Sequence, residues 1–207
     1  MDFLALCQRL RARAGISGSG PASVEGQTGE MARVVDWVRD AWVDLQSVRA
    51  DWGPLWRSLS LPVPAGATAI EPPADWRIPS GQRFRFNDRA LEWVRYDNVP
   101  DPLPASGEPL GLCLRPDKKL LLLPAPIKEG VLTGGYYAQP QRLVEGEDTP
   151  WLPEHLQDAI IYQALIYYAV YEDAPEIYQD AQLKREQYLQ RMTNELVPDP
   201  LVTGALA

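Results

Sequence analysis

Apolar residues recur with helical spacing in the first fifty positions of the chain. In residues 2–14 four of them share one helical face, with arginines pointing elsewhere and Gly15 ending the pattern. Residues 28–50 repeat the spacing over a longer stretch, and Trp37 falls off the apolar stripe. The pattern predicts a short amphipathic helix and a long one, joined by the glycine- and serine-rich segment GISGSGPASVEGQTG.

The helical period disappears between residues 58 and 144, where most of the prolines lie. Five strand-like runs separated by turn signals replace it, namely RFRFN, ALEWVRYD, LGLCLRP, KLLLLPAP and GVLTGGYYAQP. Two of them alternate between apolar and polar residues, as half-buried antiparallel strands do. Pro124 and Pro126 favour a sheet edge or a bulge after the fourth run. Gly134 and Gly135 favour a β-bulge over a phosphate-binding turn.

Helical character then returns in two segments. Residues 153–172 are apolar nearly all round, which predicts a helix buried on most sides, with Pro153 in its first turn. Pro175 starts a last helix that runs to about Leu196. We therefore predict an α+β, mainly α protein: a bundle of about four helices from residues 1–57 and 145–196, a central β-rich insertion at 58–144 and an extended tail at 197–207.

Charge is spread unevenly over this plan. Residues 1–144 carry 17 basic and 16 acidic side chains, whereas residues 145–207 carry 3 and 12, and the formal net charge is −8. The acidic quarter is either a solvated face or a face that meets a basic partner or repels a polyanion. Nucleic-acid binding by counterion release would need the opposite sign.

The hydropathy of the chain, its N-terminal segment and its cysteines indicate where the protein is made and whether it crosses a membrane. The chain has no run of eighteen apolar residues, which predicts no membrane span. In the N-terminal segment the charges follow the apolar residues, unlike a secretory signal, so we expect synthesis in the cytoplasm. Cys7 and Cys113 fit no metal or redox spacing and are expected to be reduced and buried.

Few residues could carry chemistry. His155, the single histidine, lies beside Glu154 and near Asp158, but zinc would need further ligands. A surface or capping role is the favoured interpretation. No phosphate-binding loop, dinucleotide-binding motif or nucleophile motif is present, so we predict no catalytic, cofactor-binding or metal-binding residue and no enzyme. A hydrolase using Glu154 and Asp158 is the weakest alternative. The tyrosines of the C-terminal quarter are expected to pack between helices rather than to stack on bases.

Three segments, in this order, resemble the head-to-tail adaptor (connector) proteins of tailed bacteriophages. They are FLALCQRLRARAGISGSGP with GEMARVVDWVRDAWVDLQ, then LLLLPAP with GGYYAQPQRL, then EDTPWLPEHLQDAIIYQALIYYAVYEDAP. The resemblance implies a structural protein of the virion neck, made in the host cytoplasm. Such adaptors form a ring, usually twelvefold, beneath the portal. The ring extends the DNA channel and provides a docking platform for the tail.

The resemblance and the charge pattern together suggest two sets of functional residues. Acidic residues expected to face the channel, past which double-stranded DNA would move without specific binding, are Glu172, Asp173, Glu176, Asp180 and Glu186. Tail residues expected to contact the portal or a neighbouring subunit are Pro198, Pro200, Leu201, Val202 and Leu206. The implied partners are the portal protein, a tail or nozzle component and other copies of the chain, with no membrane. The rival is a small-ligand or regulatory binding module, which would need a concave pocket with convergent polar groups.

Overall fold

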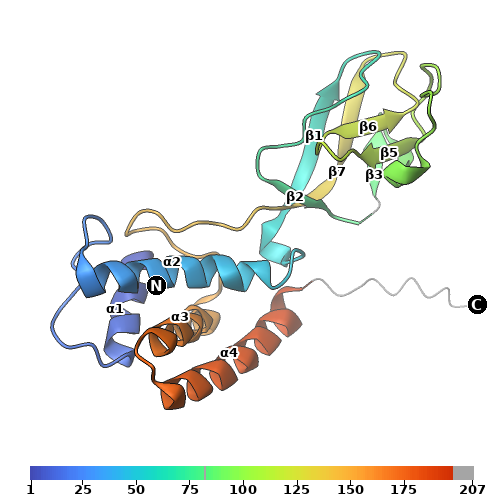
Figure 1. Ribbon diagram of the computed structural model, residues 1–207. Coiled ribbons are helices and arrows are strands. Elements are labelled where there is room, and N and C mark those ends of the chain that lie inside the picture. The colour runs from blue at the N-terminus through green and yellow to red at the C-terminus, as the bar shows by residue number, and fades with distance from the viewer. Residues whose placement is uncertain (82, 198–207) are drawn as a thin grey trace, which may run out of the picture. The chain divides into compact units, whose positions relative to one another are not determined.

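The computed structural model describes residues 1–81 and 83–197, which form two compact units (Figure 1). The helical unit comprises Met1–Pro54 and the chain from Pro140 onward, and the β unit comprises Leu55–Gln139. The chain therefore leaves the helical unit once, builds a sheet and returns.

The two N-terminal helices confirm the periodicity of the sequence. Helix α1 spans Phe3–Arg13 and begins at Asp2, whose Oδ1 accepts a hydrogen bond from Ala5 N at 2.8 Å. Helix α2 spans Gly29–Ser47, and its apolar stripe is buried. Both helices present one apolar face to the core of the helical unit, as amphipathic helices do.

Helix α3, Asp158–Tyr171, is the central element of the helical unit. It follows a short 3₁₀ turn, Glu154–Leu156, and contacts α1, α2 and the last helix, α4, Pro175–Leu196 (Figure 1). This confirms the prediction of a helix buried on most sides, but its predicted start is wrong, since Pro153 precedes the 3₁₀ turn and the α-helix begins at Asp158. Helix α4 differs, because only Ala181 and Met192 of its 22 residues are buried. Most of its circumference is thus left open in a single chain.

Gln46, which is fully buried, ties α2 to the segment that returns from the β unit. Its Nε2 donates to the carbonyl oxygen of Gln141 at 2.9 Å, and its Oε1 accepts from Gln141 N at 2.8 Å and from Trp151 Nε1 at 2.9 Å. The Trp151 ring packs on Trp42 and Trp52. A buried amide is stable only when its hydrogen bonds are made, so these bonds fix the returning segment in place.

The β unit contains one mixed sheet of seven strands with the order β1-β7-β3-β4-β5-β6, and β2 pairs with β7 beside β3. The pairing of β4 with β5 is parallel and all others are antiparallel. Its core is made by inward side chains such as Leu59, Trp76, Phe84 and Leu132. The strands are β1 Trp56–Val63, β2 Trp76–Pro79, β3 Phe84–Phe86, β4 Arg89–Trp93, β5 Gly111–Leu114, β6 Leu120–Leu123 and β7 Gly130–Ala138.

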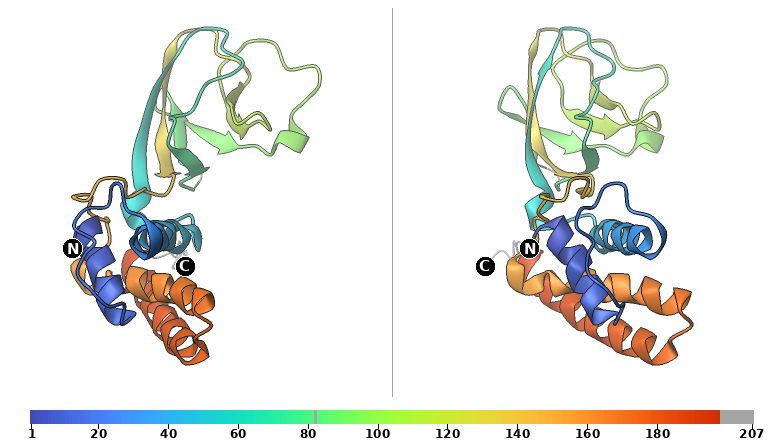
Figure 2. Two further views of the ribbon diagram at one scale, coloured as in Figure 1. Left: turned by 60° about the vertical axis from the view of Figure 1, so that its left-hand side comes forward. Right: turned by 90° about the vertical axis from the view of Figure 1, so that its left-hand side faces the viewer.

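The expectation of a mainly helical protein is wrong. The sheet, which curls on itself (Figure 2), makes up a large β portion with its own core. Strands β1 and β2 are not among the five runs predicted from the sequence, the first of which is RFRFN. Proline is tolerated where its nitrogen faces away from the ladder, at an edge strand, and β1 is such a strand.

The β-bulge expected at Gly134 and Gly135 is also absent from the β1–β7 ladder. Register runs without a shift from Trp56 opposite Tyr137 to Val63 opposite Gly130. A Cβ on Gly134 would collide with the Phe84 ring, and one on Gly135 would lie 2.7 Å from Trp56 Nε1. The two glycines therefore make room for aromatic rings on the two faces of the sheet.

Candidate functional site

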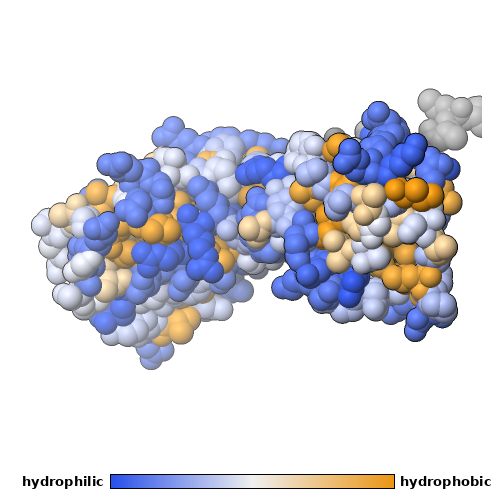
Figure 3. All heavy atoms as spheres, turned by 90° about the horizontal axis from the view of Figure 1, so that it is seen from above, coloured by the Kyte–Doolittle hydropathy of each residue, from blue (hydrophilic) through white to orange (hydrophobic). Residues whose placement is uncertain are grey.

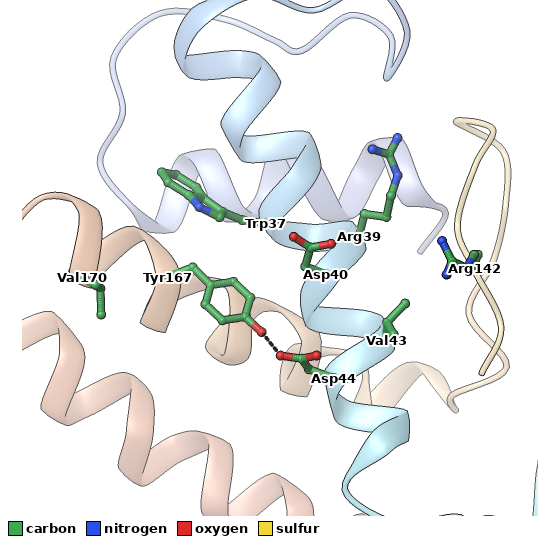
Figure 4. A pocket seen from close by; sticks show the side chains of 8 residues that line it. All are labelled: Trp37, Arg39, Asp40, Val43, Asp44, Arg142, Tyr167 and Val170. Carbon is green, nitrogen blue, oxygen red and sulfur yellow. Dashed lines mark hydrogen bonds between the residues drawn. The ribbon is translucent and has the colours of Figure 1, made fainter. Parts of the chain in front are cut away.

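A recess of about 550 Å³ opens on the helical unit between α2, α3 and the segment returning from the β unit (Figure 4). Aromatic and aliphatic side chains form part of its wall, and carboxylates and guanidinium groups form the rest. Its lining residues are Trp37, Arg39, Asp40, Val43, Asp44, Arg142, Tyr167 and Val170. Such a mixed, open surface suits a side chain or a short segment of another protein.

A chain of hydrogen bonds runs from this recess across the helices. Tyr167 Oη donates to Asp44 Oδ2 at 2.5 Å and accepts from Gln163 Nε2 at 2.9 Å. Gln163 Oε1 in turn accepts a hydrogen bond from Arg185 Nε. The pKa of Tyr167 is raised, first by burial and then by its bond to Asp44. Tyr167 therefore stays neutral and keeps donating, so α2, α3 and α4 are linked through one continuous polar path.

Trp37, which falls off the apolar stripe of α2, has a partner on α3. Its ring centroid lies 5.9 Å from that of Tyr168 and 5.7 Å from that of Tyr171. The Arg33 guanidinium lies 4.5 Å from the Tyr171 ring centroid. These tyrosines pack against helices, as the sequence predicted, and their rings are occupied by aromatic and cationic neighbours.

The five acidic residues expected to face a channel are all exposed on the helical unit. Glu172 and Asp173 lie in the turn between α3 and α4, and Glu176 and Asp180 follow one turn apart on α4. Those four gather at one end of the helical hairpin. Glu186 lies about 120° around α4 from Asp180, by helical geometry. The structure thus brings four of the five together.

His155 and Asp158 make separate contacts. His155 Nε2 lies 2.9 Å from Glu195 Oε2 on α4, and both side chains are exposed. Asp158 binds two arginines of α1, with 2.8 Å to both Arg9 Nε and Arg13 Nη2. In the described part of the chain, no group of three or more histidine, cysteine or acidic side chains could hold a metal ion. Asp158 thus anchors α3 to α1.

The tail residues Pro198, Pro200, Leu201, Val202 and Leu206 lie outside the described residues. Among residues 1–81 and 83–197, no helix is long and apolar enough to cross a membrane.

Open helix surfaces, a recess that suits a side chain or short segment of another protein, and exposed acidic residues at one end of the α3–α4 hairpin are features typical of structural, protein-binding molecules. The family model described as SU10 adaptor protein matches residues 1–201, and the chain belongs to this family. It is therefore a structural adaptor protein of a bacteriophage and a component of the virion neck, and its family is not a class of enzymes. No curated protein matches the chain.

No sequence pattern indicated the recess, because its wall comes from three segments far apart in the chain. The β unit separates α2 from Arg142 and α3 along the chain, so only the folded structure brings these residues together. One signal was present: Trp37 lies off the apolar stripe of α2, and an aromatic residue there needs a partner outside the main core.

Proposed function

We propose that the chain forms a ring, twelvefold as in the adaptors it resembles, beneath the portal of a tailed phage. The ring extends the DNA channel from the portal and offers a docking platform to the tail or nozzle component. The observation that carries the ring is the open face of α4, which buries only Ala181 and Met192 in a single chain. A long helix gains most of its stability by packing, so α4 is suited to contact another subunit.

Exposed apolar side chains on this part of the helical unit support the same proposal. Val170 is 68% exposed, Tyr171 54% and Leu183 56%. In a ring, a neighbouring subunit could cover these side chains and remove their apolar surface from water. A ring also needs two different complementary surfaces on each subunit. The recess beside Trp37 and the open face of α4 are two such surfaces on one chain.

The exposed acidic residues of the α3–α4 hairpin also have a role in this proposal. If Glu172, Asp173, Glu176, Asp180 and Glu186 face the channel, their charges repel DNA phosphates, so the genome slides without binding. The tail from Pro198 through Leu206 contacts the portal or a neighbouring subunit as an assembly element.

Native mass measurement of purified portal rings mixed with the chain tests the ring. We expect twelve copies per portal ring for the natural sequence. Leu183→Lys should abolish this assembly while the melting temperature of the free chain stays within a few degrees, since Leu183 is exposed. Gln182→Lys adds the same charge about 100° around the helix and should assemble. Free chains that never load onto portal rings would refute the proposal.

A further inference from the structure

The two edges of the sheet differ in how they are protected. At the β6 edge, Ile70 forms a bridge to Leu120, with Ile70 N to Leu120 O and Leu120 N to Ile70 O both 2.8 Å. Strand β1 forms the opposite edge and pairs with β7 along all eight of its residues. Within the described residues, no strand pairs with the other side of β1. Figures 1 and 2 show β1 and β7 as two long strands side by side.

The register of β1 against β7 shows which main-chain groups of β1 make no hydrogen bond to β7. Val131 O accepts from Asn87 N at 3.1 Å and Gly135 O from Ser80 N at 2.9 Å, so both residues of β7 direct their main-chain groups away from β1. Their partners, Pro62 and Ser58, therefore point theirs toward the free edge. Because side-chain and main-chain directions repeat every second residue, Ser60 does so too. The N–H groups of Ser58 and Ser60 therefore face the side of β1 with which no strand of the described chain pairs.

This edge carries only part of the protection that soluble proteins place on free strands: Pro62 at its end offers no N–H, but Ser58 and Ser60 before it do. Its ladder has no bulge, and Arg57 is the one charged residue in the strand. Arg57 Nη1 donates to the carbonyl oxygen of Trp56, its own neighbour. The side chains of Ser58 and Ser60 are small and exposed. An eight-residue edge of this kind is suited to receive an added strand.

An apolar recess lies where the edge ends. It has a volume of about 580 Å³ and is lined by Pro62, Val63, Pro64, Glu129, Gly130 and Val131. Val131 is 41% exposed and stands opposite Pro62 in the ladder. Figure 3 looks onto this unit from above and shows apolar side chains among polar ones on its surface. A strand added to β1 could therefore seat one apolar side chain at its end.

We propose that residues 201–207 of a neighbouring copy add to the free edge of β1 as a strand, a step that rests on the proposed ring. This segment, LVTGALA, has no charged side chain and no proline, so all seven residues carry an N–H. Its length equals that of Trp56–Pro62, about 23 Å of strand at roughly 3.3 Å per residue. Leu201, Val202 and Leu206 are its larger apolar residues, and the proposal seats one of them in the recess at Pro62 and Val131. The sheet of each subunit would thereby be continued by its neighbour.

Cysteine cross-linking in assembled necks tests this pairing. One variant carries Ser58→Cys, the other a single cysteine at one position from 201 to 207, and the two are produced together during phage assembly. Neither carries both cysteines, so any mixed disulfide joins two copies. The natural Cys7 and Cys113 are buried and their pKa values are raised, which keeps them out of exchange.

The expected result is a mixed disulfide concentrated at the one tail position that lies opposite Ser58, with weaker cross-links at most two residues away on the same face and none at the adjacent positions, whose side chains face the other side. Glu92→Cys, an exposed residue of β4 away from the edge, is the matched control and should give none. Cross-linking at all positions, at none, or to the portal instead would overturn the proposal. Rings that form without the pattern refute the strand alone, whereas the absence of rings refutes the proposed function as well.

Ser60→Pro tests the same edge without cysteines. The substitution removes an N–H that faces the side of β1 with which no described strand pairs, and Ser60→Ala keeps it. Ser60→Pro should lower the yield of assembled necks about tenfold relative to Ser60→Ala, since it removes one main-chain hydrogen bond and crowds the added strand. Equal yields from two folded variants would contradict the proposal. If Ser60→Pro fails to fold, the cross-linking pattern decides alone.

Discussion

Tyr167 on α3 donates a hydrogen bond to Asp44 on α2, with 2.5 Å between Oη and Oδ2. The bond stands in the wall of the recess and continues through Gln163 to Arg185 on α4. Three helices are thus connected by one chain of hydrogen bonds. We expect a substitution in this chain to alter the recess, which we assign to subunit contact.

Tyr167→Phe should lower the free energy of unfolding by about 1 kcal/mol, because the hydroxyl bond to Asp44 and the bond from Gln163 are both lost while Asp44 stays solvated. Chemical denaturation measures the change. Tyr178→Phe is the matched control, since Tyr178 is exposed on α4, and it should change stability by less than about 0.5 kcal/mol. Equal effects of the two substitutions would show that the path through Tyr167 contributes nothing.

The same bond predicts a loss of stability at alkaline pH. The pKa of Tyr167 is raised above the ordinary 10.0, so its contribution is complete below pH 10 and falls as pH rises from 10 through the folded-state pKa. Unfolding between pH 8 and 11 should therefore show a steeper decline in the natural protein than in Tyr167→Phe. Tyr136, whose pKa burial raises to about 12, contributes equally to both and cancels in the comparison. Parallel curves would contradict the assignment.

His155→Ala should change stability by less than about 0.5 kcal/mol and leave assembly intact, because His155 contacts Glu195 in an exposed pair. Asp158→Ala is the informative comparison. It leaves Arg9 and Arg13 without their shared carboxylate and should cost about 1–2 kcal/mol. Stoichiometric zinc in the purified protein, lost in His155→Ala, would contradict the surface role of His155.

Replacing Glu172, Asp173, Glu176 and Asp180 together by lysine should slow genome ejection, because new cations at the channel wall bind phosphates. Ejection triggered in solution at several salt concentrations measures the effect, which should shrink as salt rises. A set of four lysine substitutions at Glu71, Asp97, Asp101 and Glu108 of the β unit adds the same charge elsewhere. Unchanged ejection in the first set would contradict a channel-facing hairpin.

Residue patterning predicted the helices well and the proportion of sheet poorly. The period of α1 and α2 is carried by many apolar residues each, and Pro175 does open α4. Strand β1 was not predicted, although Leu59, Leu61 and Val63 alternate with exposed residues along it. Its Pro62 is a residue that central strands exclude and that only an edge strand accommodates. Gly134 and Gly135 suggested a bulge. In the structure they leave space for the rings of Phe84 and Trp56, which come near them only through the pairing of β7 with its neighbouring strands.

The site was harder to foresee than the fold. Asp44 and Tyr167 are 123 positions apart, and nothing local to either residue marks their bond. His155 and Asp158 are near in sequence but have different partners. His155 contacts Glu195 on α4, whereas Asp158 binds Arg9 and Arg13 on α1. Sequence spacing fixes neighbours along a helix, whereas the packing of other helices decides which of them meet.

Electron cryo-microscopy of intact virions tests the central claim most directly. The account predicts twelve copies of the chain in one ring between portal and tail, with α4 against a neighbouring subunit and Glu172, Asp173, Glu176 and Asp180 lining the channel. Density for the chain at low copy number and away from the neck would contradict it.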